Sequence, residues 1–274
     1  MALDQNFDED KEMSFLDHID IFRKHLVRSI IAILLLSTVA FIFKEILFDV
    51  IIFGPSKTDF WSYRKVCELS QYIYSDNRLC IEKINFTVFN RSVTGQFNMH
   101  FFVALVAGFV LAFPYILWEI WRFIRPALST KERTYATGLV GYGTLLFMSG
   151  IGFGYFIMIP ISINFLGNYQ VSDVVSNDFT LESYINFVSM LTLASAVIFE
   201  LPIFIYFMAK MGIISSEFLK KYRRYAIVIV LVIAAIVTPP DVASQLILSF
   251  PLMLLYEIGI MITKRVEKSR ANAE

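Results

Sequence analysis

Charged side chains gather in one stretch between two long apolar runs, and this stretch has a clear capacity to bind a ligand. Residues 118–135, WEIWRFIRPALSTKERTY, combine two carboxylates, Glu119 and Glu132, with four cations. The aromatic rings of this stretch, beginning at Trp118, are favoured where hydrocarbon meets headgroups. Pro126 has no amide proton, so a helix should end before it and a new one should follow. We expect an ordered helix–turn–helix at a membrane surface, suited to recognition.

Glu200 is a carboxylate of a different kind, because it lies about 15 residues into an apolar run. Such a group costs roughly 3 kcal/mol on insertion scales, and it usually faces a bundle interior or a wet cavity and has a function. The alternative is a neutral carboxyl bonded to a backbone carbonyl freed by Pro202. Gln245 is a second polar group in an apolar run, and its amide can hydrogen-bond to another helix.

No enzymatic motif accompanies these groups. The sequence has neither a Gly-rich phosphate-binding loop of the Walker type nor an HExxH pair. His18, His25 and His100 stand at the edges of apolar runs without metal-ligand spacing, and we interpret them as interfacial. We expect a protein that is not an enzyme and that uses no metal or cofactor.

Cys67 and Cys80 both lie in the long polar loop of residues 44–95. If this loop is outside the cytoplasm, it is in a compartment that permits disulfides. A ring of this size would be stabilised by about 3 kcal/mol in the chain-entropy model. The spacing does not fix the geometry, so a bridge and two free thiols are both open.

The composition indicates the elements that carry these groups. The chain is 57% hydrophobic, contains 27 phenylalanines and is only 18% charged, whereas soluble domains are about 25% charged. A formal net charge of zero excludes a basic nucleic-acid binder. We predict an all-α membrane protein with six transmembrane helices in the lipid bilayer. The expected spans are residues 26–43, 97–117, 136–159, 184–209, 226–237 and 242–262.

The flanks of these spans predict the topology. Residues 1–12 form a disordered acidic tail, 13–262 a membrane domain, and 263–274 a polar, basic tail. Residues 13–28 have the period of an amphipathic helix, which we expect to lie flat and then turn into the first span, an uncleaved anchor. Seventeen Lys and Arg residues fall on the side of the termini and seven on the other, so both termini should be cytoplasmic.

The fifth span is short. Its 12 apolar residues would give about 18 Å of helix, against about 30 Å of hydrocarbon. Either the bilayer thins or polar flanks snorkel around it, or the span begins earlier and residues 221–225 enter the headgroups.

Four motifs together resemble one family. They are FLDHIDIFRKHLVRS before the first span, FPYILWEIWRFIRPALSTKER after the second, FELP in the fourth, and TPPDVASQ…P…LYEIG across the last two. In this order they resemble TatC, the largest subunit of the twin-arginine protein translocase, from residue 13 to residue 262. The resemblance implies a bowl-like bundle of six helices with short fifth and sixth helices, in the cytoplasmic (inner) membrane. It also implies protonmotive-force-driven export of folded cargo without catalytic chemistry.

The same resemblance implies a binding site for the cargo's signal peptide, whose hallmark is two adjacent arginines. It assigns Glu132, Phe123, Arg23 and Pro55 to this site. Two guanidinium groups need carboxylates in fork geometry. The family usually has two successive acids after the motif's histidine, whereas this chain has Asp20 followed by isoleucine. Either Asp20 substitutes for the missing acid, or it only pairs with Arg23 or the adjacent lysine.

The family likeness also implies partners. Glu200 matches an intramembrane glutamate on the concave face, and Thr238 and Gln245 match polar positions where the single-span subunits TatA and TatB dock. Other TatC copies are further expected partners. The alternative function is a solute or ion transporter with Glu200 as a proton relay. Such transporters often contain internal repeats, and we recognise none between residues 26–134 and 136–262.

Overall fold

The helices are long, and most of them are apolar. A computed structural model describes residues 15–74, 80, 86–124, 136–172, 177–238 and 242–271. Five helical segments in this part are long and apolar enough to cross a membrane. They are α1 (Phe15–Ile42), α3 (Gly95–Ile124), α5 (Ala136–Phe153) with its continuation, α7 (Leu181–Phe199) with α8 (Leu201–Lys210), and α11 (Val242–Ala271). The prediction of an all-α membrane protein is confirmed.

The predicted fifth span is the helix α10 (Arg223–Val237), which is too short to count among those five. It begins three residues before the apolar run and follows the short helix α9 (Ser216–Lys221). At 15 residues it is about 22 Å long. The count of six spans and the cytoplasmic termini therefore stay predictions.

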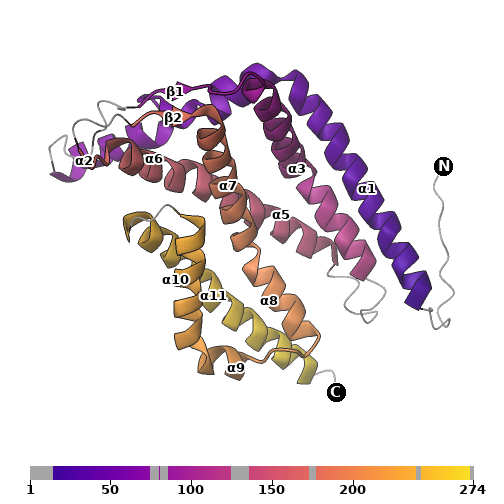
Figure 1. Cartoon of the computed structure of the whole chain (residues 1–274). Coiled ribbons are helices and arrows are strands. Elements are labelled where there is room, and N and C mark those ends of the chain that lie inside the picture. The colour runs from indigo at the N-terminus through magenta and orange to yellow at the C-terminus, as the bar shows by residue number, and fades with distance from the viewer. Residues whose placement is uncertain are drawn as a thin grey trace.

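α1 is one continuous helix, so the prediction of a flat helix that turns into the first span is wrong. No Pro or Gly interrupts residues 15–42, and the helix has no reason to end near residue 26. Figure 1 shows α1 as a single long helix beside α3. The acidic tail of residues 1–12 lies outside the described residues.

Several helices extend past the expected spans, among them the third and the sixth. Pro160 does not end the third span, because a π-helical segment, η4 (Gly154–Met158), leads into α6 (Ile159–Asn168), with the proline in the first turn of α6. A proline is tolerated there because its missing N–H would lack a helical partner anyway. α11 has 30 residues and contains Pro251, so the sixth helix is not short. It continues through most of the predicted basic tail.

A cap of short elements lies beyond one end of the long helices. It contains η1 (Ile46–Ile52), η2 (Gly54–Ser56), α2 (Trp61–Tyr74) and two strands, β1 (Val88–Phe89) and β2 (Phe179–Thr180). The strands pair in parallel, Val88 with Phe179 and Phe89 with Thr180. Figure 1 shows α2, α6 and both strands together at this end, and α9 near the opposite end.

The core joins the middle of the bundle to the cap. Met158, Ile159, Ile185 and Leu248 are fully buried members of its largest cluster. α1 packs mainly on α3, and the backbones of the two helices approach closely at Gly108, where an added Cβ would lie 2.7 Å from the Cα of Ser37. Small residues permit this approach. The α1–α3 pair thus forms one side of the molecule.

Candidate functional site

The candidate site lies where the beginning of α1 meets the end of α3. The two helices run in opposite directions: the ring of Phe22 lies 5.3 Å from that of Phe123, while near their other ends Phe41 stacks on His100 at 3.8 Å. The first of these contacts brings together residues that are far apart in the sequence. This contact, between Phe22 and Phe123, involves the stretch of residues 118–135.

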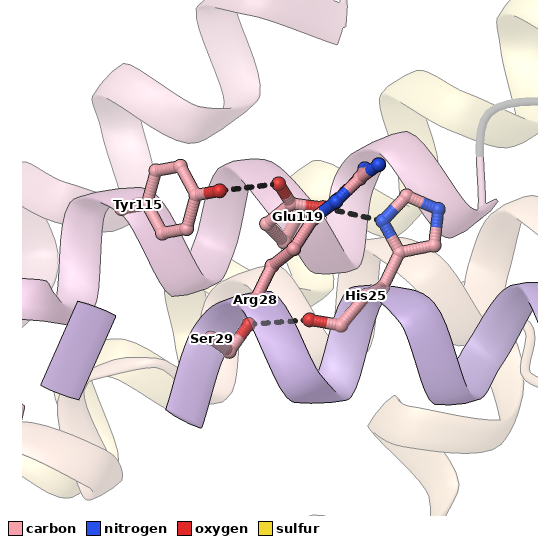
Figure 2. A network of polar contacts seen from close by, with 5 residues as sticks. All are labelled: His25, Arg28, Ser29, Tyr115 and Glu119. Atoms are coloured by element: carbon pink, nitrogen blue, oxygen red, sulfur yellow. Dashed lines mark hydrogen bonds and ion pairs between the residues drawn. The ribbon is translucent and has the colours of Figure 1, made fainter. Parts of the chain in front are cut away.

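Glu119 is the centre of a polar network between the two helices, shown in Figure 2. Its side chain is only 1% exposed. The Tyr115 hydroxyl donates to Glu119 Oε1 at 2.7 Å, and His25 Nδ1 is hydrogen-bonded to Glu119 Oε2. Arg28 Nη1 lies 4.0 Å from the same oxygen. A buried carboxylate is tolerated only when it is hydrogen-bonded and paired, and these three residues meet that need.

Helical spacing explains how the network forms. Tyr115 and Glu119 are four residues apart on α3, and His25 and Arg28 are three apart on α1, so each pair shares one helix face. A carboxylate only accepts, so His25 Nδ1 carries the proton of this bond. The Ser29 hydroxyl donates to the His25 carbonyl at 3.0 Å. The His25 side chain is 14% exposed and lies between the two helices, and its place at the membrane interface stays a prediction.

The aromatic contact adjoins this network by one helical turn. Phe123 follows Glu119 by four residues, and Phe22 precedes His25 by three. The ring of Phe123 also meets His25 edge-on at 6.1 Å. The Arg122 guanidinium lies 5.3 Å from the centre of the Trp118 ring. The polar network therefore holds a cluster of rings at the end of α3.

Asp20 and Arg23 lie on the exposed side of the same end of α1. Arg23 Nη2 is 3.6 Å from Asp20 Oδ1, and the two side chains are 71% and 63% exposed. The pairing that the sequence left open as an alternative is therefore present. An exposed pair of this kind contributes at most about 1 kcal/mol, so another guanidinium can compete for Asp20.

Two predicted members of the site are not seen with these residues. Glu132 belongs to residues 125–135 and, like Pro126, lies outside the described part of the chain. Pro55 does not lie with Asp20, Arg23 and Phe123, and its assignment to the signal-peptide site stays a prediction. It is fully buried in η2, beyond the opposite end of α1, and 28 residues of helix measure about 42 Å.

Pro55 has a structural contact instead. The Tyr63 hydroxyl donates to the Pro55 carbonyl at 3.0 Å. Burial raises the pKa of Tyr63 well above its usual range. The phenol is thus a neutral donor that ties α2 to η2. Cys67, on the same helix, is joined by a disulfide to Cys80.

Glu200 sits at the break between α7 and α8, where it ends one helix and begins the next. Neither of its carboxyl oxygens has a hydrogen-bond partner among the described residues, although both are buried. The indole Nε1 of Trp121 is also buried and has no hydrogen-bond partner among the described residues. Gly143 of α5 faces Glu200, since an added Cβ there would lie 3.5 Å from its Oε2.

Thr238 and Gln245 belong to the α10–α11 hairpin. The Gln245 side-chain amide donates to the Leu231 carbonyl at 3.1 Å, and the Thr238 hydroxyl donates to the Ala234 carbonyl at 2.8 Å. Thr238 is buried at 6% exposure. Both side chains therefore already bond to α10 within this chain.

Comparison with known proteins adds an independent finding. The sequence model of the family described as "Sec-independent protein translocase protein (TatC)" matches residues 17–251.

The chain belongs to the TatC family.

TatC relatives match nearly the whole chain. The TatC protein of Blattabacterium sp. subsp. Periplaneta americana (strain BPLAN) is 40% identical over 263 residues, which cover 96% of this chain and 99% of that protein. The TatC of Aquifex aeolicus (strain VF5) is 34% identical, with coverages of 94% and 98%.

Two solved structures match as well. A crystal structure of the twin-arginine translocase receptor TatC superposes with a TM-score of 0.66 at 32% identity, covering 91% of this chain and 99% of that one. A second, of the receptor in the detergent DDM, gives 0.69 at 34%, with coverages of 89% and 98%. The chain is thus a multi-pass membrane subunit of a Sec-independent protein translocase, and not an enzyme in the catalytic sense.

Sequence reasoning named Glu119 only as one charge among several and missed its partners. The available signal was the i,i+4 pair of Tyr115 and Glu119 at the end of an apolar run. Its complement on α1, His25 with Arg28, lies 94 and 91 residues before Glu119 in the chain. Nothing in a single sequence connects the two pairs.

Proposed function

We propose that this TatC chain is the receptor subunit that binds the paired arginines of a cargo signal peptide at the α1–α3 end. The binding residues are Asp20, Arg23, Phe123 and Glu132. In this role the chain lies in the cytoplasmic membrane with both termini inside. It assembles with TatA/TatB-type subunits and further TatC copies, and takes part in protonmotive-force-driven export of folded cargo.

The observation that carries this proposal is the exposed Asp20 at the same end of α1 as Phe22, whose ring contacts Phe123 of α3. Among the residues that the structure describes, Asp20 is held by the weak, exposed pair with Arg23 alone. An incoming arginine gains a charge-assisted hydrogen bond to that carboxylate, and its planar guanidinium can stack on a ring such as Phe123. Glu132, nine residues beyond Phe123, supplies the second carboxylate for the second arginine.

The distribution of cations supports the orientation. Seventeen of the 24 Lys and Arg residues fall in the segments on the side of the termini and of residues 118–135, as the positive-inside rule requires for a cytoplasmic side. A cargo peptide that has not yet crossed the membrane meets this side first.

The partner role rests on the buried polar groups. Glu200 carries two buried oxygens without donors among the described residues, and a polar side chain from another membrane helix can supply a donor. Interhelical hydrogen bonds of this type contribute about 0.6–1.7 kcal/mol in lipid. Thr238 and Gln245 are the other proposed partner positions, and each already donates a hydrogen bond to a carbonyl of α10.

The test is photocrosslinking of a signal peptide to a probe at position 123. Crosslinks are expected with the paired arginines and are expected to vanish when both become lysines, because lysine cannot make the bidentate contact. Loss of one charged hydrogen bond, worth about 1.5–3 kcal/mol, predicts roughly tenfold or greater weakening in Asp20→Asn and in Glu132→Gln.

Glu217→Gln is the matched control, since Glu217 is an exposed acid in the first turn of α9 and is not assigned to the site. Crosslinks that persist with the lysine peptide and in both acid variants would overturn the assignment. If crosslinks are lost only in Glu132→Gln, Asp20 does not bind the peptide and only pairs with Arg23.

A further inference from the structure

A cavity lies at the other end of the α1–α3 pair, away from the proposed receptor site. Its volume is about 870 Å³, within the roughly 300–1,000 Å³ range of small-molecule sites. It is an open cavity lined by the segment after α1, by β1 and by the beginnings of α3 and α7. Its lining residues are Lys44, Glu45, Phe48, Asp49, Phe53, Ser56, Phe86, Val88, Phe89, Asn90, Gln96, Phe97, His100 and Leu181.

The cavity carries charges of both signs. Lys44, Glu45 and Asp49 are exposed on its lining and make no ion pair with any other residue in the part of the chain that is described. One ammonium and two carboxylates fit a ligand with one anionic and one cationic group. A phosphate pairs with a lysine, and a primary ammonium donates to carboxylates.

The aromatic wall of the cavity is held in place. His100 Nε2 lies 3.0 Å from the Phe41 carbonyl, so it donates this hydrogen bond. In the neutral ring Nδ1 is then left as an acceptor. The His100 ring stacks on Phe41 at 3.8 Å and meets Phe48 edge-on at 5.6 Å. Phenylalanine faces attract a cation as well as hydrocarbon, so this wall suits an ammonium group.

The position of the cavity identifies the source of such a zwitterion. Lys44 follows directly after the apolar part of α1, where hydrocarbon gives way to headgroups. Beside it, the outward faces of both helices are apolar, with Ile42 71%, Phe97 61% and Phe101 55% exposed. The rings of Phe97 and Phe101 lie 4.9 Å apart and lead from the cavity onto the face where acyl chains lie.

We infer that this cavity binds the headgroup of a zwitterionic phospholipid with a primary ammonium, such as phosphatidylethanolamine. Lys44 takes the phosphate, and Glu45 and Asp49 take the ammonium against the ring of Phe48. The acyl chains lie along α1 and α3. The inference is independent of the proposed signal-peptide site, which lies at the opposite end of the same two helices.

The test measures lipid retention by native mass spectrometry of the full chain, purified in detergent and mixed with one lipid at a time. The probes are phosphatidylethanolamine, phosphatidylcholine, which lacks ammonium N–H donors, and anionic phosphatidylglycerol. We expect phosphatidylethanolamine to be retained about five- to tenfold more strongly than phosphatidylcholine, from one or two charge-assisted hydrogen bonds. The double variant Glu45→Gln/Asp49→Asn should lose this preference.

Asp59→Asn is the matched control, because Asp59 is an exposed acid of the same loop that does not line the cavity. A second measurement does not depend on the double variant. The chain has two cysteines, joined to each other, so Gln96→Cys introduces a single free thiol on the cavity wall. Phosphatidylethanolamine vesicles should slow its alkylation severalfold relative to phosphatidylcholine vesicles.

Four results would overturn the inference. The first is equal retention of the three lipids, and the second is a preference that the double variant keeps. The third is stronger retention of phosphatidylglycerol that depends on Lys44, which would assign the cavity to anionic lipid. Unchanged lipid retention together with altered cargo crosslinking in the double variant would also count against it, and would assign the cavity to cargo.

Discussion

Removal of the Glu119 carboxylate is expected to separate the beginning of α1 from the end of α3. Glu119→Ala leaves His25 Nδ1–H and the Tyr115 hydroxyl without their acceptor, and Arg28 without its counter-charge. A buried donor left unpaired costs about 1–3 kcal/mol in proteins generally. In membranes such bonds average only about 0.6 kcal/mol, with a maximum near 1.7, because the unfolded chain in lipid finds other partners.

The geometry sets the value between these limits. Tyr115 is 37% exposed and can find another partner, so its loss contributes little. His25, 14% exposed, cannot do so as easily, and its bond is to a charged group, which strengthens it. We expect the free energy of unfolding to fall by about 2–3 kcal/mol in Glu119→Ala, of which about 1.5 kcal/mol is coupling to His25.

The assay is a double-mutant cycle of Glu119→Ala and His25→Ala. The free energy of unfolding of each variant is measured by reversible unfolding in mixed micelles, monitored by tryptophan fluorescence. The matched control is the cycle of Lys65 and Glu68, an exposed pair at 2.6 Å on α2, which should couple by less than about 0.5 kcal/mol. The crosslink at position 123 should weaken in parallel. A His25–Glu119 coupling no larger than the control would refute the reasoning.

Two further predictions concern covalent and backbone constraints. Cys67→Ser removes the disulfide to Cys80 and should lower the stability of the cap by about 3 kcal/mol. A native protein with the same melting temperature in reducing and in oxidising buffer would contradict this. Gly108→Ala places a Cβ within 2.7 Å of the Ser37 Cα and should destabilise the α1–α3 pair by about 1–3 kcal/mol, whereas Gly138→Ala, with nothing within 4 Å, should unfold like the native protein.

The apolar runs predicted the existence of the long helices well but their ends less well. A run of apolar residues indicates which segment prefers lipid, but it does not indicate where helical hydrogen bonding ends. α11 continues to Ala271 because its polar end is rich in helix-forming residues. Pro160 was a poor stop signal, because it occupies the first turn of α6. Pro251 lies within α11, as the predicted span of residues 242–262 allowed.

The candidate site was predictable only in part, for a similar reason. Phe123, Asp20 and Arg23 were found through family motifs, and they do lie at one end of α1 and α3. The pairing of His25 with Glu119 depends on the register between two helices. That register is fixed by contacts such as Gly108 against Ser37, which a single sequence does not reveal. The strands β1 and β2 have two residues each, which is too short to show the alternating pattern that predicts a strand.

The parallel pairing of β1 with β2 has a consequence for the order of assembly during synthesis. The two strands are 91 residues apart in register, and two membrane-crossing segments, α3 and then α5 with α6, lie between them. Both strands reach the same side of the membrane only after those segments have been inserted. The strand pairing of the cap therefore closes after the ribosome has made residue 180, when α1 and α3 can already be in contact.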